Sequence, residues 1–157
     1  MLRTRAGLLA ALLLAAAPGA SVLSGAAGQS VTVTMAEFKF TPAQVTLRAG
    51  MPAGMRVANK GTVDHEFMVY EKPKAGATAM ELHDWARERS YFLGVQAKVE
   101  GRVTDLERKG KDVVMVMLAP GESATIKFIP KKTGTFEIGC FLPGHYEAGM
   151  KAVLVVR

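Results

Sequence analysis

The chain has 157 residues, of which 49% are hydrophobic, which is enough for one domain with its own core but short for two. The formal net charge is +6 at pH 7, from 20 basic and 14 acidic residues. The basic residues are scattered or stand in short pairs without interleaved aromatic residues, and this pattern argues against nucleic-acid binding. We therefore expect a single domain with a mildly basic, solvated surface.

The first 27 residues have the layout of a secretory signal peptide. Arg3 and Arg5 precede an apolar run at residues 8–17, and small residues follow. The run is short for a membrane span, so we predict cleavage after Ala27 and a folded domain at residues 28–157. An uncleaved N-terminal anchor is the alternative. Either way we expect an exported protein, periplasmic or extracellular, which is soluble or tethered to a membrane but not stably inserted in it.

From residue 28 onward, apolar and polar residues alternate with a period of two, which is typical of half-buried strands. Eight segments have this pattern, and most of them end near Gly, Pro or Asn: 30–35, 44–50, 54–61, 65–71, 112–118, 124–130, 134–140 and 151–157. This density of short strands predicts an all-β fold, either a sandwich or a Greek-key barrel.

Residues 71–112 interrupt the alternation. Thr78 and Glu81 have the spacing of a helix capping box, and Leu82, Trp85 and Ala86 stand at i, i+3 and i+4. These positions predict an amphipathic helix laid against the sandwich. The remainder of the segment alternates weakly and predicts a hairpin or a loop. We therefore treat 71–112 as one inserted, helix-containing segment.

The single cysteine of the chain, Cys140, is followed by His145 and Met150 at regular steps of five. One cysteine in an exported protein forms no internal disulfide, so it is buried and inert, paired between chains, or bound to a ligand. Thiolate, imidazole and thioether are together a donor set that suits copper cycling between two oxidation states. Strand alternation places both Cys140 and Met150 on the core-facing side of their strands.

His65, the first residue of the segment 65–71, supplies a second imidazole. It shares its strand face with Phe67 and Val69, whereas Glu66 faces the other way and is not expected to bind metal. A polar ring at the head of a core-facing row needs a partner. Copper would be such a partner.

With these residues the chain resembles the type 1 (blue) copper proteins of the cupredoxin family. The resemblance is carried by the stretch "EFKFTPAQVTLRAG" at 37–50, by the strand-end histidine, and by a Cys-x4-His-x4-Met loop between the last two strands. It implies one copper ion with His65, Cys140 and His145 as equatorial ligands and Met150 as the axial ligand. The implied fold is an eight-stranded Greek-key sandwich. Many cupredoxins have an asparagine after the first histidine that ties the two ligand loops together, and here Glu66 stands in its place.

The function implied by the resemblance is one-electron transfer without enzymatic activity, by a monomer. In the family, the histidine of the C-terminal loop reaches the surface through an apolar patch where partners dock. The resemblance therefore implies docking of redox partner proteins near His145 and its apolar neighbours Phe141, Leu142, Pro143 and Tyr146. The alternative is a copper-binding protein for copper tolerance, storage or delivery, which the nine methionines favour mildly. A metal-free interaction sandwich would leave the four ligand candidates without a purpose.

Other interpretations are a different chemistry for Cys140 and metal binding by His83 or by the pair Met115 and Met117. A catalytic cysteine would leave the methionine of the loop without a role, and no motif around Cys140 supports a nucleophile. His83 lies in the predicted helix without a second ligand at a suitable offset, so we expect it to face solvent. Met115 and Met117 share one strand face, and we expect them to pack in the core rather than to bind copper(I).

Overall fold

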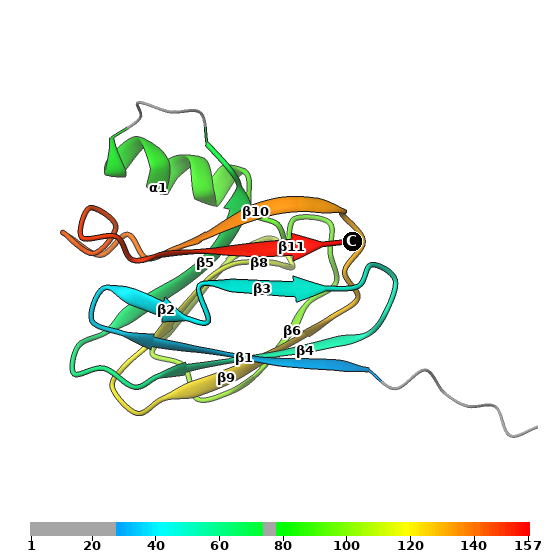
Figure 1. The fold of residues 1–157 in the computed structure, drawn as a ribbon, viewed down its shortest axis with the longest axis horizontal. Helices are drawn as coiled ribbons and strands as arrows, with labels where there is room; N and C mark the ends of the chain where they lie inside the picture. Colours follow the sequence, from blue (N-terminus) through cyan, green and yellow to red (C-terminus); the bar gives the residue numbers. More distant parts are fainter. Residues whose placement is uncertain (1–27, 74–77) are drawn as a thin grey trace, which may run out of the picture.

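The computed structural model describes residues 28–73 and 78–157, so the predicted signal peptide and its cleavage site lie outside the described residues. Two β-sheets pack face to face, and one helix lies on the outer face of one sheet (Figure 1). The five-stranded sheet has the order β2 (Lys39–Thr41), β1 (Gln29–Ala36), β4 (Ala53–Asn59), β9 (Ser123–Phe128) and β6 (Lys98–Gly101). The six-stranded sheet has the order β3 (Gln44–Leu47), β11 (Lys151–Val156), β10 (Gly134–Gly139), β5 (His65–Glu71), β8 (Asp112–Leu118) and β7 (Asp105–Lys109).

The prediction of an all-β sandwich is confirmed, and each of the eight predicted strands is present. The described residues contain three more strands, β2, β6 and β7. Two of these lie in the predicted insertion, where β6 pairs with β9 and β7 pairs with β8. They belong to different sheets, so the expectation of a hairpin or a loop was wrong. Short strands at sheet edges carry little alternation of their own, because only one neighbour and part of one face are buried.

The main core fills the space between the two sheets and consists of the inward-facing residues of both. β1 pairs in parallel with β4 inside the five-stranded sheet, and β3 pairs in parallel with β11 at one edge of the six-stranded sheet, while the pairs around β5 and β10 are antiparallel. The first six residues of β5 are buried without alternation. The reason is that its outer face is covered as well, by the helix.

That helix, α1 (Ala79–Glu88), begins with the predicted capping box. The Thr78 hydroxyl accepts a hydrogen bond from the Glu81 amide, and the Glu81 carboxylate accepts one from the Thr78 amide. Leu82 and Ala86 are buried, as expected for the apolar face. Ala86 belongs to a second apolar cluster between α1 and the sheet, which also contains Met68, Tyr70, Val114 and Met115.

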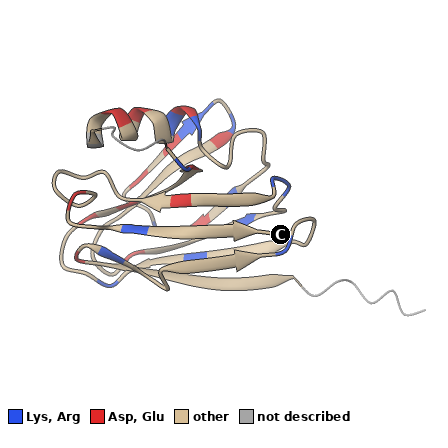
Figure 2. Ribbon diagram, turned by 45° about the horizontal axis from the view of Figure 1, so that its top comes forward, with Lys and Arg blue, Asp and Glu red and all other residues tan. Residues whose placement is uncertain are grey.

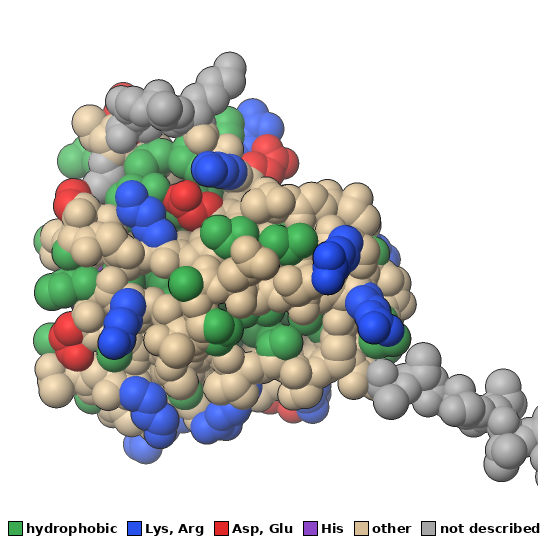
Figure 3. Space-filling model, viewed as in Figure 1, with side chains coloured by type: hydrophobic (Ala, Val, Ile, Leu, Met, Phe, Trp, Pro, Cys, Tyr) green, Lys and Arg blue, Asp and Glu red, His purple; other side chains and the backbone are tan. Residues whose placement is uncertain are grey.

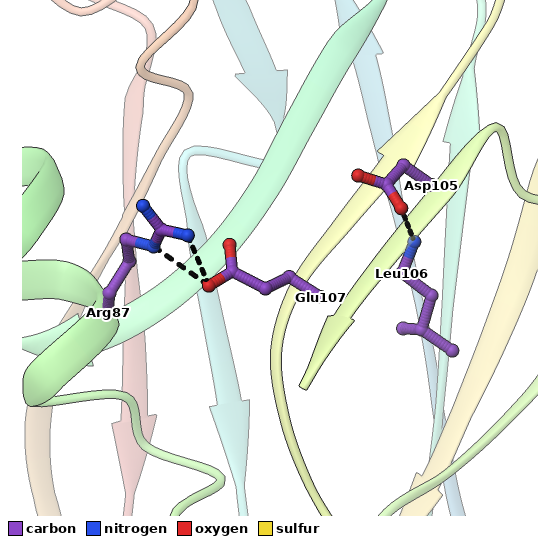
Figure 4. Close-up of polar contacts among 4 residues, drawn as sticks. All are labelled: Arg87, Asp105, Leu106 and Glu107. Atoms are coloured by element: carbon purple, nitrogen blue, oxygen red, sulfur yellow. Dashed lines mark hydrogen bonds and ion pairs between the residues drawn. The ribbon is translucent and has the colours of Figure 1, made fainter. Parts of the chain in front are cut away.

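Polar contacts hold α1 over the six-stranded sheet. The Trp85 indole donates to the carbonyl of Glu71 at 2.8 Å. Figure 4 shows Arg87 reaching β7, where Nε and Nη2 both donate to one oxygen of Glu107, at 2.8 and 2.6 Å. Both signs of charge are interspersed along the helix and over the strand ends (Figure 2). Within the described residues, no helix is both long and apolar enough to cross a membrane.

Candidate metal centre

The four predicted ligands come from two chain segments at one end of the sandwich, the start of β5 and the loop between β10 and β11. The loop between β10 and β11 lies at the end opposite the C-terminus (Figure 1). Antiparallel pairing of β10 with both β5 and β11 brings the end of β10 beside the start of its neighbours. Cys140 directly follows β10, Met150 directly precedes β11, and His65 is the first residue of β5. The topology therefore gathers them.

The donor atoms of three of these residues converge. The donor atoms of His65, Cys140 and His145 all lie within 4.8 Å of one another. The two Nδ1 atoms of the histidines are 3.3 Å apart, and the Cys140 sulfur lies 3.3 Å from Nδ1 of His145. Met150 is fully buried, its amide donates to the carbonyl of His145 at 3.0 Å, and its carbonyl accepts from the Cys140 amide at 3.4 Å. Three of the four predicted residues thus bring their donor atoms together, and the backbone of Met150 lies beside two of them.

The ligand loop is a compact series of turns. The amide of His145 donates to the carbonyl of Leu142 at 2.9 Å, and the amide of Ala148 donates to the carbonyl of Gly144 at 3.0 Å. Gly144 and Gly149 have positive φ angles of 82° and 98°, which glycine adopts readily because it has no Cβ. The local sequence therefore sets the path that carries His145 and Met150 back toward Cys140.

Burial disfavours the charged forms of His65 and Cys140. Burial lowers the pKa of His65, and the charge of His145 lowers it further. Burial raises the pKa of the Cys140 thiol to about 11, although hydrogen bonds from the amides of Glu66 and Leu142 oppose this. Metal binding there would require the thiolate form of Cys140, which the charge of the ion would stabilise as the proton leaves to solvent.

The residues present fit a copper ion. Nδ1 of His65 and the Cys140 sulfur each lie 3.3 Å from Nδ1 of His145, so ring nitrogens and sulfur face one another where a metal ion could bind all three. Two imidazoles and one thiol surround a common point, with a buried thioether in the same loop. This mixed nitrogen and sulfur set is the one that type 1 copper prefers.

Glu66 ties the two ligand segments together. Its amide donates to the Cys140 sulfur at 3.3 Å, and its carboxylate accepts from the Phe141 amide at 3.0 Å. A carboxylate therefore makes the inter-loop hydrogen bond that an asparagine makes in many cupredoxins. The carboxylate lies on the outer side of β5, so the expectation that it points away from the metal donors is confirmed.

The aromatic residues of the ligand loop do not all face the solvent. Phe141 is half-buried and stacks on Tyr146, with ring centroids 4.9 Å apart, and Tyr146 is only 7% exposed. The hydroxyls of Tyr70 and Tyr146 both donate to one oxygen of Glu137, at 2.7 Å each. These rings therefore form a layer under α1. Among the apolar loop residues predicted to surround His145, Leu142 and Pro143 therefore supply the surface beside it.

Two of the expectations about other candidates can be compared with the structure. His83 does not simply face solvent, because its ring stacks on Phe141 at 5.4 Å and its Nε2 atom is buried. That expectation was wrong, since the ring lies between α1 and the ligand loop. Met115 is buried in the second apolar cluster and Met117 packs against it, so both side chains pack as expected.

Sequence reasoning missed Phe38, in the turn between β1 and β2. Its ring lies edge-on to the His145 ring, with centroids 5.1 Å apart, and 44% of the residue is exposed. Phe38 has a positive φ of 58°, which is uncommon for a residue with a side chain. An exposed aromatic residue in a two-residue turn was the available signal, but nothing local connects it to a histidine more than 100 residues away.

Comparisons with known proteins agree with this geometry. Residues 5–83 match the family model described as a cupredoxin-like domain. The copper-resistant cuproprotein CopI of Rubrivivax gelatinosus is 31% identical over 132 residues, which cover 83% of this chain and 68% of that protein. The copper-resistant cuproprotein CopI of Pseudomonas aeruginosa is 24% identical, with coverages of 83% and 77%.

Similar folds occur among solved structures. The dithionite-reduced auracyanin of Roseiflexus castenholzii superposes with a TM-score of 0.58 at 21% identity, covering 83% of this chain and 98% of that one. Auracyanin B gives a TM-score of 0.55 at 22% identity, with coverages of 82% and 88%. The family-model match ends before the loop at 140–150, so the assignment of that loop depends on the geometry described above.

Proposed function

The chain belongs to the cupredoxin-like family with copper as its cofactor, and we propose that His65, Cys140, His145 and Met150 hold one type 1 copper ion for one-electron transfer. The observation that carries this proposal is the convergence of two imidazoles and one thiol within 4.8 Å, beside a buried methionine. We further propose that the protein works outside the cytoplasm as residues 28–157, as a carrier rather than as an enzyme.

When bound, copper supplies a one-electron couple between its Cu(II) and Cu(I) states. The contribution of the chain is to hold its donors in one arrangement in both states. His65 and Cys140 stand at the ends of paired strands, and Met150 is fixed by backbone hydrogen bonds to Cys140 and His145. Little rearrangement of the protein then opposes the transfer of an electron.

The path to a partner would run through His145. His145 is partly exposed, whereas the other three ligand candidates are buried. Apolar side chains beside it come from Phe38, Leu142 and Pro143, and hydrophobic side chains are visible at this end of the molecule (Figure 3). An exposed apolar patch suits a small, transient interface. We propose that a redox partner docks there onto a monomer.

Copper handling is the second candidate function. The 31% identity with a protein named for copper resistance favours it, because in such a role copper itself can be the cargo. The two functions differ in whether copper stays bound. An electron carrier keeps its copper through repeated oxidation and reduction, whereas a delivery protein gives it up to a chelator or an acceptor protein.

The visible and EPR spectra of the Cu(II)-loaded protein test the proposed site, with Cys140→Ala measured beside it. We expect strong thiolate-to-copper charge-transfer absorption that disappears in the variant. A colourless protein that binds copper equally well without Cys140 would contradict the type 1 assignment. Copper retention over several cycles of reduction and reoxidation, in the presence of a Cu(I) chelator, then separates electron transfer from copper delivery.

A further inference from the structure

One two-residue turn, Glu37–Phe38 between β1 and β2, approaches both histidines of the metal centre. Phe38 contacts His145 through the edge-on ring contact described above. Glu37 contacts the loop that leads to His65, where its carboxylate accepts hydrogen bonds from the amide and from the hydroxyl of Thr62, the latter at 3.0 Å. The turn therefore reaches the two imidazoles from outside the ligand set.

The Glu37 carboxylate also lies close to the ring of His65. A Cβ atom added to Gly61 would lie 2.5 Å from Oε1 of Glu37 and 2.9 Å from Nε2 of His65. Both atoms thus lie within 3 Å of one point, on either side of a glycine that leaves room for them. Nε2 is the buried nitrogen without a hydrogen-bond partner.

The other nitrogen of His65 faces the metal centre, since its Nδ1 is the atom 3.3 Å from Nδ1 of His145. A metal ligand needs its lone pair free, so the ring hydrogen of His65 must sit on Nε2 when Nδ1 binds. Ligating histidines commonly direct this second N–H toward a carboxylate, which fixes the tautomer and raises the basicity of the ligand.

We propose that Glu37 is a positioning residue for His65: its carboxylate, anchored by Thr62 and close to Nε2, favours the ring hydrogen on that nitrogen and so directs Nδ1 toward the metal. The proposal rests on the proposed copper site. The hydrogen bonds from Thr62 lower the pKa of Glu37 to about 2, so the carboxylate carries its charge at neutral pH. A negative charge behind the ligand favours Cu(II) over Cu(I), because it stabilises the more positive ion.

Two substitutions distinguish a direct effect of the Glu37 carboxylate on His65 from a role of Glu37 in anchoring the loop through Thr62. Glu37→Gln removes the charge but keeps a side chain of the same shape that can still accept from Thr62. Thr62→Val removes one anchoring hydrogen bond and keeps the carboxylate. We expect Glu37→Gln to weaken Cu(II) affinity by about 10- to 100-fold, the usual range for outer-shell partners, and to raise the reduction potential. We expect a smaller loss in affinity for Thr62→Val.

Competition titration with a Cu(II) chelator and redox titration of the full protein measure these effects. Unchanged affinity and potential in Glu37→Gln would overturn the proposal. A loss in Thr62→Val as large as that in Glu37→Gln would also overturn it, because Glu37 would then act only by anchoring the loop. Glu37→Asp, which keeps the charge, is expected to recover part of the affinity.

A measurement on metal-free protein makes the test independent of the copper site. Nitrogen-15 NMR of the histidine rings reports which nitrogen of His65 carries the hydrogen. We expect the Nε2–H tautomer in the wild-type protein and a shift toward Nδ1–H in Glu37→Gln. A wild-type ring with its hydrogen on Nδ1 would contradict the role of Glu37 even if a variant failed to fold. A protein that lacks the type 1 spectrum would instead contradict the proposed function.

Discussion

Where β5 meets β10, the polar groups on the two faces of the six-stranded sheet differ in the partners they find. On the inner face, the nitrogen and sulfur donors of His65, Cys140 and His145 converge within 4.8 Å of one another. On the outer face, the Glu66 carboxylate accepts from the Phe141 amide, and Glu137 accepts from two tyrosine hydroxyls. Since folding normally pairs buried polar atoms, groups that the chain satisfies itself serve the structure. Donors that converge on one another, as the three on the inner face do, are available to a metal ion.

The largest expected effect is the loss of copper-linked stabilisation when a ligand candidate on the inner face is removed. Copper that binds only the folded state stabilises it by about 4 kcal/mol when free copper is 1,000 times its dissociation constant. We expect His145→Ala to lose most of this gain, while the metal-free stability changes little because the ring is partly exposed. Denaturant unfolding with and without Cu(II) measures both quantities. His83→Ala is the matched control, and a loss of the copper-linked gain in that variant would contradict the comparison.

Next in size is the hydrogen bond of Glu66 on the outer face. In Glu66→Ala, the Phe141 amide loses its acceptor at a buried position, which costs about 1–3 kcal/mol of unfolding free energy. Glu66→Gln keeps an acceptor oxygen, so we expect a smaller loss. Urea unfolding of the metal-free variants gives the two values. Equal losses would show that charge or packing, rather than the hydrogen bond, accounts for the role of Glu66 on this face.

Removing a hydrogen bond to Glu137, the acceptor shared by two tyrosines on the outer face, is expected to have a smaller effect on stability. Tyr70→Phe and Tyr146→Phe each remove one of two hydrogen bonds to the same oxygen of Glu137. Each is expected to cost about 1 kcal/mol. The double variant is expected to cost more than the sum, because it leaves the carboxylate without either donor. A double-mutant cycle by urea unfolding measures the coupling, and strict additivity would contradict the shared role.

The ionisation of Tyr70 and Tyr146 is expected to have the smallest effect on stability at neutral pH. Burial, followed by the contact with Glu137, raises the pKa of both Tyr70 and Tyr146 above the ordinary value of 10.0. Above pH 10 the unfolded chain therefore releases protons that the folded chain keeps, so stability falls as the pH rises. Ultraviolet titration of the phenols with parallel unfolding curves measures this. Ordinary titration of all tyrosines in the folded protein would contradict the buried network.

The metal centre could be predicted from the sequence in part. Cys140, His145 and Met150 stand out by residue type and spacing, and alternation placed His65 on the core side of β5. The strand ends of β10 and β5 then meet as antiparallel pairing requires. The contacts of Glu66 with Cys140 and Phe141 span 74 and 75 residues. The contact of Glu37 with Thr62 spans 25 residues. No local pattern encodes such pairs.

By itself, then, the sequence determined the eight main strands, the capped helix and the chemistry of the donor set, because alternation, capping and residue type are local properties. Only the tertiary structure decided that β6 and β7 join different sheets, that His83 of α1 stacks on Phe141 of the ligand loop, and that Glu37 lies near His65. Each of these depends on which segments pack side by side. Packing also determines which buried polar atoms find a partner and which are left for a metal ion.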